Sequence, residues 1–148
     1  MIGKGRIKAI SISKERGTRK TNVSAAELRT DFGMVGDAHA GSPKRQVSLL
    51  AAESIEKMIA AGVQVSPGDF AENITTEGID LLKLSIGHKL KLGEHVELQI
   101  VELGKVCHNR CKIFEQIGDC VMPREGVFAK VTKPGQITIG DAVELVND

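Results

Sequence analysis

The chain alternates short apolar and polar stretches, which predicts a mostly β protein. The clearest alternation covers residues 89–92 and 96–101, where every second residue is Leu, Val or Ile. A period of two is typical of a strand with one buried face. Gly93 and Glu94 lie between the two runs and predict a turn, so the two strands are expected to form a hairpin.

Other short apolar runs are bounded by Gly and Pro and predict further strands. These runs cover residues 5–13, 45–50, 70–76, 126–131, 136–139 and 142–146. Residues 86–92 and 139–145 share one order, namely an apolar residue, a glycine turn and an alternating strand. This similarity indicates paired strands of a barrel rather than a repeat array. We expect a closed or partly closed β-barrel in a single domain, residues 1–148.

Helical patterns are few and short. Residues 51–62 predict the clearest α-helix, because apolar residues recur at i, i+4, i+7 and i+8 and Gly62 suits the position after a helix. Residues 23–28 offer a short helix or turn, since Ser24 precedes Glu27 by three residues, as in a capping box. A few short α-helices are therefore expected beside the barrel.

Composition and charge narrow the function classes. The chain is 41% hydrophobic and 26% charged, which is typical of a soluble globular domain. A net charge of +1 and the absence of Trp and Tyr argue against a nucleic-acid partner. No apolar run is long enough for a membrane helix, and the first residues lack the apolar region of a signal peptide. We therefore expect a cytoplasmic protein with reduced thiols.

The three cysteines lie close together, at Cys107, Cys111 and Cys120. An odd number argues against a disulfide framework. Three interpretations are open. Cysteine is often a small buried hydrophobe, which suits Cys107 after Val106. A structural zinc site would use the three cysteines and His108, although such sites usually bring two paired motifs. The third interpretation is a reactive or metal-ligating thiolate.

Cys111 is the best candidate for chemistry. The sequence predicts a short helix over residues 108–117, which places Cys111 near its first turn. A helix N-terminus and nearby cations lower the pKa of a thiol, and His108, Arg110 and Lys112 supply such cations. The thiolate is both the better nucleophile and the metal-binding form.

Two glycine-containing segments are further candidates. Four cations surround a glycine in residues 14–20, which is either a solvated basic loop or a loop that binds an anion. Residues 31–41 contain three glycines around Asp37 and His39. In an extended segment these two side chains would lie on the same side. The alternative is a loop in which Asp37 only stabilises a turn.

Several blocks, taken together and in order, resemble the MOSC domain, which is named after the C-terminal domain of molybdenum cofactor sulfurase. The blocks cover residues 33–41, 45–50, 67–78, 107–111, 126–131 and 135–141. The resemblance implies a β-barrel similar to that of pyruvate kinase, in a stand-alone minimal member of bacterial type. It also implies binding of the molybdenum cofactor, a pterin phosphate that carries the metal, or handling of sulfur destined for it.

The resemblance implies one working cysteine, which carries a persulfide or ligates molybdenum. In the related amidoxime-reducing proteins this cysteine follows an arginine. Here the step Arg110-Cys111 places the role on Cys111, with Cys120 second and Cys107 third. The resemblance also implies roles for other residues. The cations Lys14, Arg16, Arg19, Lys20 and Arg45 are expected to bind the phosphate of the cofactor. Asn73 and Thr75 are expected to bind the pterin or the phosphate. Asp37, His39 and Arg110 are expected in the same pocket.

The resemblance implies partners as well. Pyridoxal phosphate would be found only on a separate cysteine desulfurase that supplies sulfur. The hypothesis is thus a molybdenum cofactor-binding or sulfur-carrier protein. One alternative is a molybdenum-dependent reductase of N-hydroxylated compounds, with a redox partner. The others are a non-enzymatic cofactor-binding module and a structural zinc domain.

Overall fold

The computed structural model describes residues 4–14, 20–38, 40–43, 45–62, 64–70, 72–103 and 126–146. Strands dominate it. In chain order the elements are β1 (Lys4–Ile12), β2 (Thr21–Val23), β3 (Ala25–Arg29), β4 (Gly33–Met34), β5 (Val47–Ala51), α1 (Ala52–Ala60), β6 (Ile74–Glu77), a 3₁₀ turn (Leu81–Lys83), β7 (Lys89–Leu92), β8 (Val96–Leu103), β9 (Val127–Lys133), β10 (Gly135–Thr138) and β11 (Ala142–Leu145).

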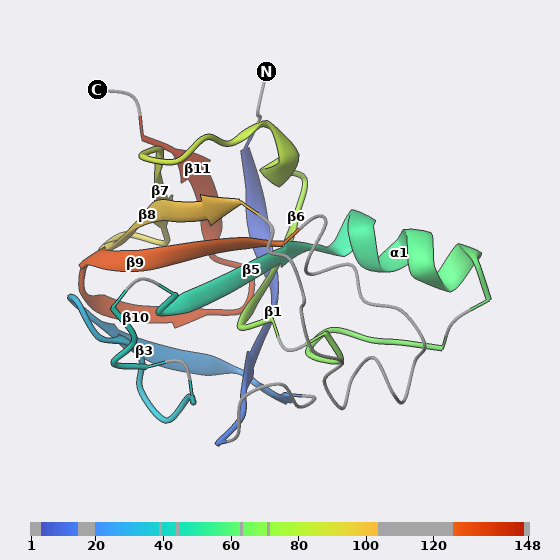
Figure 1. Ribbon diagram of the computed structural model, residues 1–148, viewed down its shortest axis with the longest axis horizontal. Coiled ribbons are helices and arrows are strands. Elements are labelled where there is room, and N and C mark those ends of the chain that lie inside the picture. The colour runs from blue at the N-terminus through green and yellow to red at the C-terminus, as the bar shows by residue number, and fades with distance from the viewer. Residues whose placement is uncertain are drawn as a thin grey trace.

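Seven of these strands form a closed barrel, as the sequence predicts. Their order is β11-β7-β8-β9-β5-β6-β1, and β1 pairs back with β11 to close the ring. Every neighbouring pair is antiparallel except β5 and β6. Strand β2 extends the sheet from β1, and β10, β3 and β4 form a separate small sheet. Figure 1 shows the barrel strands with β3 and β10 below them and α1 projecting to one side.

The core fills the barrel with aliphatic side chains in the predicted alternation. In β8 the core residues are Val96, Leu98 and Ile100, each fully buried, and on the neighbouring strand β7 Leu92 pairs with Val96 and Leu90 with Leu98. Burial of one such side chain contributes roughly 1.5–3 kcal/mol. The predicted hairpin is confirmed.

The two similar segments of the sequence are neighbours in the barrel. Strand β7 pairs antiparallel with β11, so that Leu92 lies opposite Val143 and Leu90 opposite Leu145. The prediction that these segments are paired barrel strands is confirmed. Together with the β1–β11 pairing, they complete the ring.

A bulge in β1 adjusts its buried face. The register of β1 against β6 shifts between Ile7 and Ala9. As a result Ile7 and Ile10, three residues apart, both belong to the core, whereas a regular strand would alternate every second residue. Past the bulge, Ser11 lies among polar partners at the end of the strand.

Helix α1 lies within the predicted range. Its buried residues include Ile55 and Met58, but Ile59 is 51% exposed, so the apolar face is narrower than the spacing predicts. Gly62 has a φ of 95° just past the helix end, as the sequence predicts for this position. The helix lies on the connection from β5 to β6, and such a long crossover is what a parallel pair requires.

Two predicted elements differ from the structure. Residues 23–28 were expected as a helix or turn, but Ala25–Arg29 forms β3, which pairs with β10 and β4. Pairing on both edges outweighs the local capping pattern. The strand predicted over residues 70–76 begins only at Ile74, and before it the Glu72 carboxylate accepts a hydrogen bond from the Phe70 N–H. The helix predicted over residues 108–117 lies outside the described residues.

Candidate functional site

Many of the predicted site residues lie outside the part of the chain that the structure describes. These are the three cysteines, Cys111 included, together with Arg16, Arg19, His39 and Arg110. The predicted residues that are described are Lys14, Lys20, Asp37, Arg45, Asn73 and Thr75. Within the described ranges, no group of three or more His, Cys, Asp or Glu side chains could hold a metal ion.

The barrel fixes both ends of the chain segment that carries the cysteines. Leu103, the last residue of β8, is the cross-strand partner of Val127, the first residue of β9. Directly beside this pair, Glu102 lies opposite Phe128. The two residues that flank the cysteine segment in the described structure are therefore held side by side at this point of the barrel rim.

Arg45 lies at the same rim and holds a carboxylate. Its Nη2 lies 2.7 Å from Glu102 Oε2, and its Nε donates to Oε1 over 3.1 Å. The guanidinium carbon also lies 5.3 Å from the centre of the Phe128 ring, which fits a cation–π contact. Two parallel contacts of this kind are the geometry in which arginine also binds phosphate.

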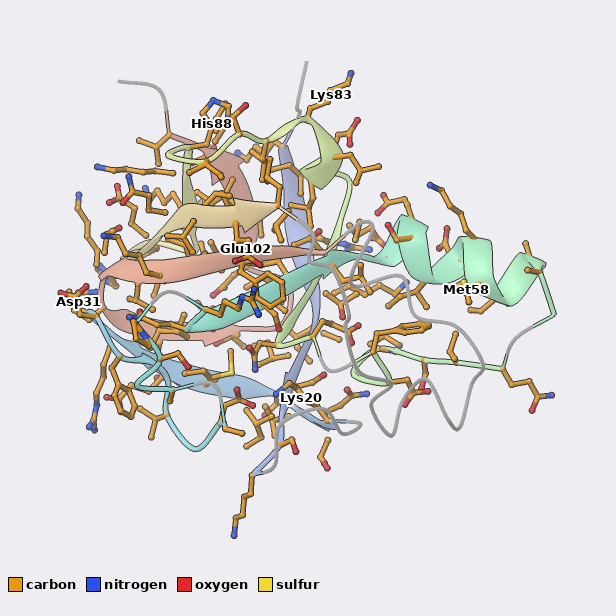
Figure 2. The ribbon with its side chains drawn as sticks, in the orientation of Figure 1. Lys20, Asp31, Met58, Lys83, His88 and Glu102 are labelled. Atoms are coloured by element: carbon orange, nitrogen blue, oxygen red, sulfur yellow. The ribbon has the colours of Figure 1, made fainter. Side chains whose placement is uncertain are left out.

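The residue after Arg45 anchors it to the barrel. Gln46 is almost completely buried. Its Oε1 accepts a hydrogen bond from the Val131 N–H over 3.0 Å, and its Nε2 donates to the Ser42 carbonyl. The backbone at Arg45 is thus fixed against β9, and the guanidinium is aimed by Phe128 and Glu102. Figure 2 shows Glu102 on the side of the barrel where β5 and β9 are neighbours.

Asn73 bridges three strands inside the protein. Its Oδ1 accepts hydrogen bonds from the Ser48 N–H and from the Ser48 hydroxyl, at 3.0 and 3.2 Å. Its Nδ2 donates to the Ser11 carbonyl of β1. The side chain is completely buried, so in this structure it ties β5 and β1 to the start of β6. Thr75 is also buried, and its hydroxyl donates to Glu72 Oε2 over 3.1 Å.

Glu72 is a buried acid that the sequence interpretation missed. Burial raises its pKa from 4.5 to about 7, although hydrogen bonds from backbone N–H groups and from the Thr75 hydroxyl oppose the rise. A signal was present, because Phe70, Glu72 and Ile74 occupy alternate positions and the two outer residues are apolar. That spacing would place a carboxyl on a buried face.

Asp37 points into the protein, toward Lys20. The Lys20 Nζ lies 2.7 Å from Asp37 Oδ1, and the same oxygen accepts a hydrogen bond from the Ser13 N–H. Neither side chain of the ion pair is exposed. Lys20, which the sequence placed in the basic loop, thus has its ammonium buried, whereas Lys14 is exposed. Figure 2 shows Lys20 beside the lower part of β1.

The structure brings these residues together in two places. Asn73 and Asp37 both bind the end of β1, through Ser11 and Ser13. Arg45 instead faces the rim formed by β8 and β9. The two places are linked through β5, since Ser48 binds Asn73 and is the cross-strand partner of Phe128.

These observations define a closed β-barrel protein with an arginine held at its rim by a carboxylate and an aromatic ring. The MOSC domain model matches residues 36–144, well over half of the sequence, and the chain belongs to this family. MOSC domains are linked to proteins associated with the molybdenum cofactor. Comparison with curated proteins finds no match.

Solved structures share the fold. The YuaD protein from Bacillus subtilis is 17% identical, with a TM-score of 0.79 over 96% of this chain and 95% of that one. YiiM from Escherichia coli is 22% identical, with a TM-score of 0.66 over 97% of this chain and 70% of that one. YiiM from Geobacillus stearothermophilus is 18% identical, with the same TM-score over 99% and 74%. In the described residues no helix is long and apolar enough to cross a membrane.

Proposed function

We propose that this protein binds the molybdenum cofactor and that Cys111 either ligates the metal or carries sulfur as a persulfide. The observation that carries the proposal is the match of residues 36–144 to the MOSC domain. The protein is proposed to act as a single domain in the cytoplasm. A separate cysteine desulfurase, which holds the pyridoxal phosphate, is the proposed sulfur donor.

The described residues fit the phosphate part of this cofactor. Arg45 already binds a carboxylate through two contacts, and a carboxylate stands in for two phosphate oxygens. Lys14 is exposed and available to contribute a second cation, and we propose Arg19, Arg110 and His39 as further contacts. When bound, the cofactor supplies a redox-active metal and a site that accepts sulfur.

Asn73, Thr75 and Asp37 receive a supporting role in this proposal. In the structure their polar atoms bind Ser48, Glu72 and Lys20 inside the protein. We propose that they fix the ends of the strands around the pocket, and thus the position of any group that touches the cofactor. A direct contact would require these internal hydrogen bonds to be exchanged.

The sulfur-carrier reaction needs only a thiolate and a persulfide donor. The Cys111 thiolate attacks the outer sulfur of a persulfide on the desulfurase. A new S–S bond forms on Cys111, the S–S bond of the donor breaks, and the donor cysteine leaves as a thiolate. Atoms and electrons balance without an added oxidant.

Elemental analysis tests the proposal. Wild type, Cys111→Ser and Cys120→Ser are purified from cells that synthesise the cofactor, and molybdenum and zinc are measured. Wild type and Cys120→Ser are expected to retain molybdenum or, after exposure to a desulfurase, to gain one sulfur by mass spectrometry. Cys111→Ser is expected to do neither. Retention of metal or sulfur by Cys111→Ser would refute the assignment, and stoichiometric zinc in wild type would favour the structural zinc domain.

A further inference from the structure

We propose that Glu102 is a built-in competitor at the anion site, which occupies Arg45 until the phosphate group of a ligand displaces it. The inference rests on the proposed function, since phosphate is the anionic part of the proposed cofactor. It adds a residue that sets ligand affinity without being a ligand itself.

The geometry shows why the two anions compete. Both Glu102 carboxylate oxygens contact Arg45, one through Nη2 at 2.7 Å and one through Nε at 3.1 Å. A phosphate can use the same two N–H groups for a bidentate contact. Because one guanidinium edge cannot hold both anions in this way, a phosphate that binds through Nε and Nη2 displaces the carboxylate.

The arginine is held by the ring of Phe128 and by the backbone beside it. Phe128 lies beneath the guanidinium and is almost fully buried, so its ring is a rigid support. Gln46 fixes the neighbouring backbone through hydrogen bonds to Val131 and Ser42. After Glu102 leaves, Arg45 thus remains aimed at the same point of the rim, which favours exchange of the anion over loss of the site.

The exchange is energetically feasible because the pair is partly solvated. The side chains of Arg45 and Glu102 are 44% and 28% exposed. Ion pairs with such access to water contribute little to stability, so a displaced Glu102 carboxylate would be rehydrated at small cost. In contrast, the buried Lys20–Asp37 pair has no such access and is unsuited to exchange.

The chain contains a matched ion pair for comparison. Arg6 contacts Glu77 Oε1 through both Nη2 and Nε. Glu77 is 30% exposed, close to the 28% of Glu102, whereas Arg6 is more exposed than Arg45, at 66% against 44%. This pair lies on β1 and β6, and Lys8 also contacts Glu77. Glu77→Gln therefore removes the same charge from another arginine, away from the rim.

The test is titration with inorganic phosphate at constant ionic strength, followed by NMR chemical shifts. While Glu102 occupies Arg45 in part of the molecules, the apparent affinity for phosphate equals the intrinsic affinity multiplied by the fraction of molecules in which Arg45 is free. Glu102→Gln is therefore expected to bind phosphate about two- to fivefold more tightly than wild type. Glu77→Gln is expected to match wild type. Arg45→Gln and the double variant Arg45→Gln/Glu102→Gln are expected to lose saturable phosphate binding. Arg45→Lys combined with Glu102→Gln is expected to lose most of the increase in phosphate affinity.

Three results would overturn the inference. They are unchanged or weaker binding in Glu102→Gln, an equal gain in Glu77→Gln, and no saturable binding in any variant. Molybdenum content, measured on the same proteins, separates this inference from the proposed function. If wild type contains molybdenum but Glu102→Gln binds phosphate no more tightly, the proposed function stands and the inference about Glu102 is refuted. If Glu102→Gln binds phosphate more tightly but wild type contains no molybdenum, the inference about Glu102 stands and the proposed cofactor is refuted.

Discussion

Lys20 and Asp37 form an ion pair, with 2.7 Å between Nζ and Oδ1, that is completely removed from solvent. The Asp37 oxygen also accepts a hydrogen bond from the Ser13 N–H, just past β1. The pair thus joins three segments: the end of β1, the start of β2 and the turn after β4. Removing a charge from such a site is costly because the remaining charge stays buried.

Asp37→Asn is expected to destabilise the protein. The substitution keeps the shape of the side chain but leaves the buried Lys20 ammonium facing a neutral amide. The expected loss in the free energy of unfolding is about 3 kcal/mol, measured by urea denaturation. Glu144→Gln serves as the control, since the Lys4–Glu144 pair is exposed and its loss should be below about 1 kcal/mol. Equal losses in the two variants would contradict the buried character of the pair.

Asn73→Ala is expected to destabilise the protein even without any ligand. The substitution removes the acceptor of two Ser48 donors and the donor to the Ser11 carbonyl, all buried. Each unsatisfied group costs about 1–3 kcal/mol, so a loss of at least 2 kcal/mol in the free energy of unfolding is expected. Asn22→Ala, at an exposed residue that accepts one hydrogen bond from the buried Ser11, leaves one group unsatisfied instead of three and should cost less, about 1 kcal/mol. Unchanged stability in Asn73→Ala would instead favour a direct role at the cofactor.

Glu72 predicts a specific pH dependence of stability. Its pKa is about 7 in the folded protein, against 4.5 as the ordinary value. The folded chain therefore keeps a proton that the unfolded chain releases. The resulting stabilisation is fully present below pH 4.5 and is lost as the pH rises through 7. Its size is up to about 3 kcal/mol.

Glu72→Gln should flatten this profile. Glutamine keeps one acceptor oxygen for the Phe70 N–H, and its amide N–H can donate to the Thr75 hydroxyl oxygen, but it cannot ionise. The variant is expected to be more stable than wild type above pH 7, with no difference in slope outside the window from 4.5 to 7. Unfolding free energies measured at several pH values between 4 and 8.5 provide the comparison. Parallel profiles for the two proteins would contradict the raised pKa of Glu72.

Gly68 is expected to be irreplaceable for steric reasons. A Cβ at this position would lie 2.7 Å from the Lys20 carbonyl oxygen and 3.0 Å from Ser11 Oγ, and the φ angle is +95°. Gly62 has the same φ angle, but a Cβ there would meet nothing within 4 Å. Gly62→Ala should thus cost about 1 kcal/mol for the backbone alone, and Gly68→Ala at least about 2 kcal/mol more. Similar melting temperatures for the two variants would contradict the close approach at Gly68.

The barrel was predictable from the sequence because its signal is local. Alternation in residues 89–92 and 96–101 identifies two strands, and Gly93 identifies their turn. The similarity of residues 86–92 and 139–145 even indicated a pair that the structure confirms. Where a local pattern misled, as in residues 23–28, pairing with distant strands determined the outcome.

The site was less predictable because its contacts are distant in sequence. Arg45 was identified as an anion-binding residue, but nothing near it indicates Glu102, which lies 57 residues away. Asn73 was recognised as important, yet its partners on β1 and β5 depend on the closed ring. Burial of Lys20 likewise depends on the distant Asp37, so composition alone could only suggest a solvated cation. The prediction for Cys111 stays a prediction.

The pairing of Leu103 with Val127 has a consequence for protein engineering, since the two residues hold neighbouring points of the barrel wall. Lengthening a flexible loop adds only about 0.6 kcal/mol for each doubling. We therefore expect that residues inserted between these two points leave the register of β8 and β9 unchanged, so that this edge of the barrel can accept a longer connection.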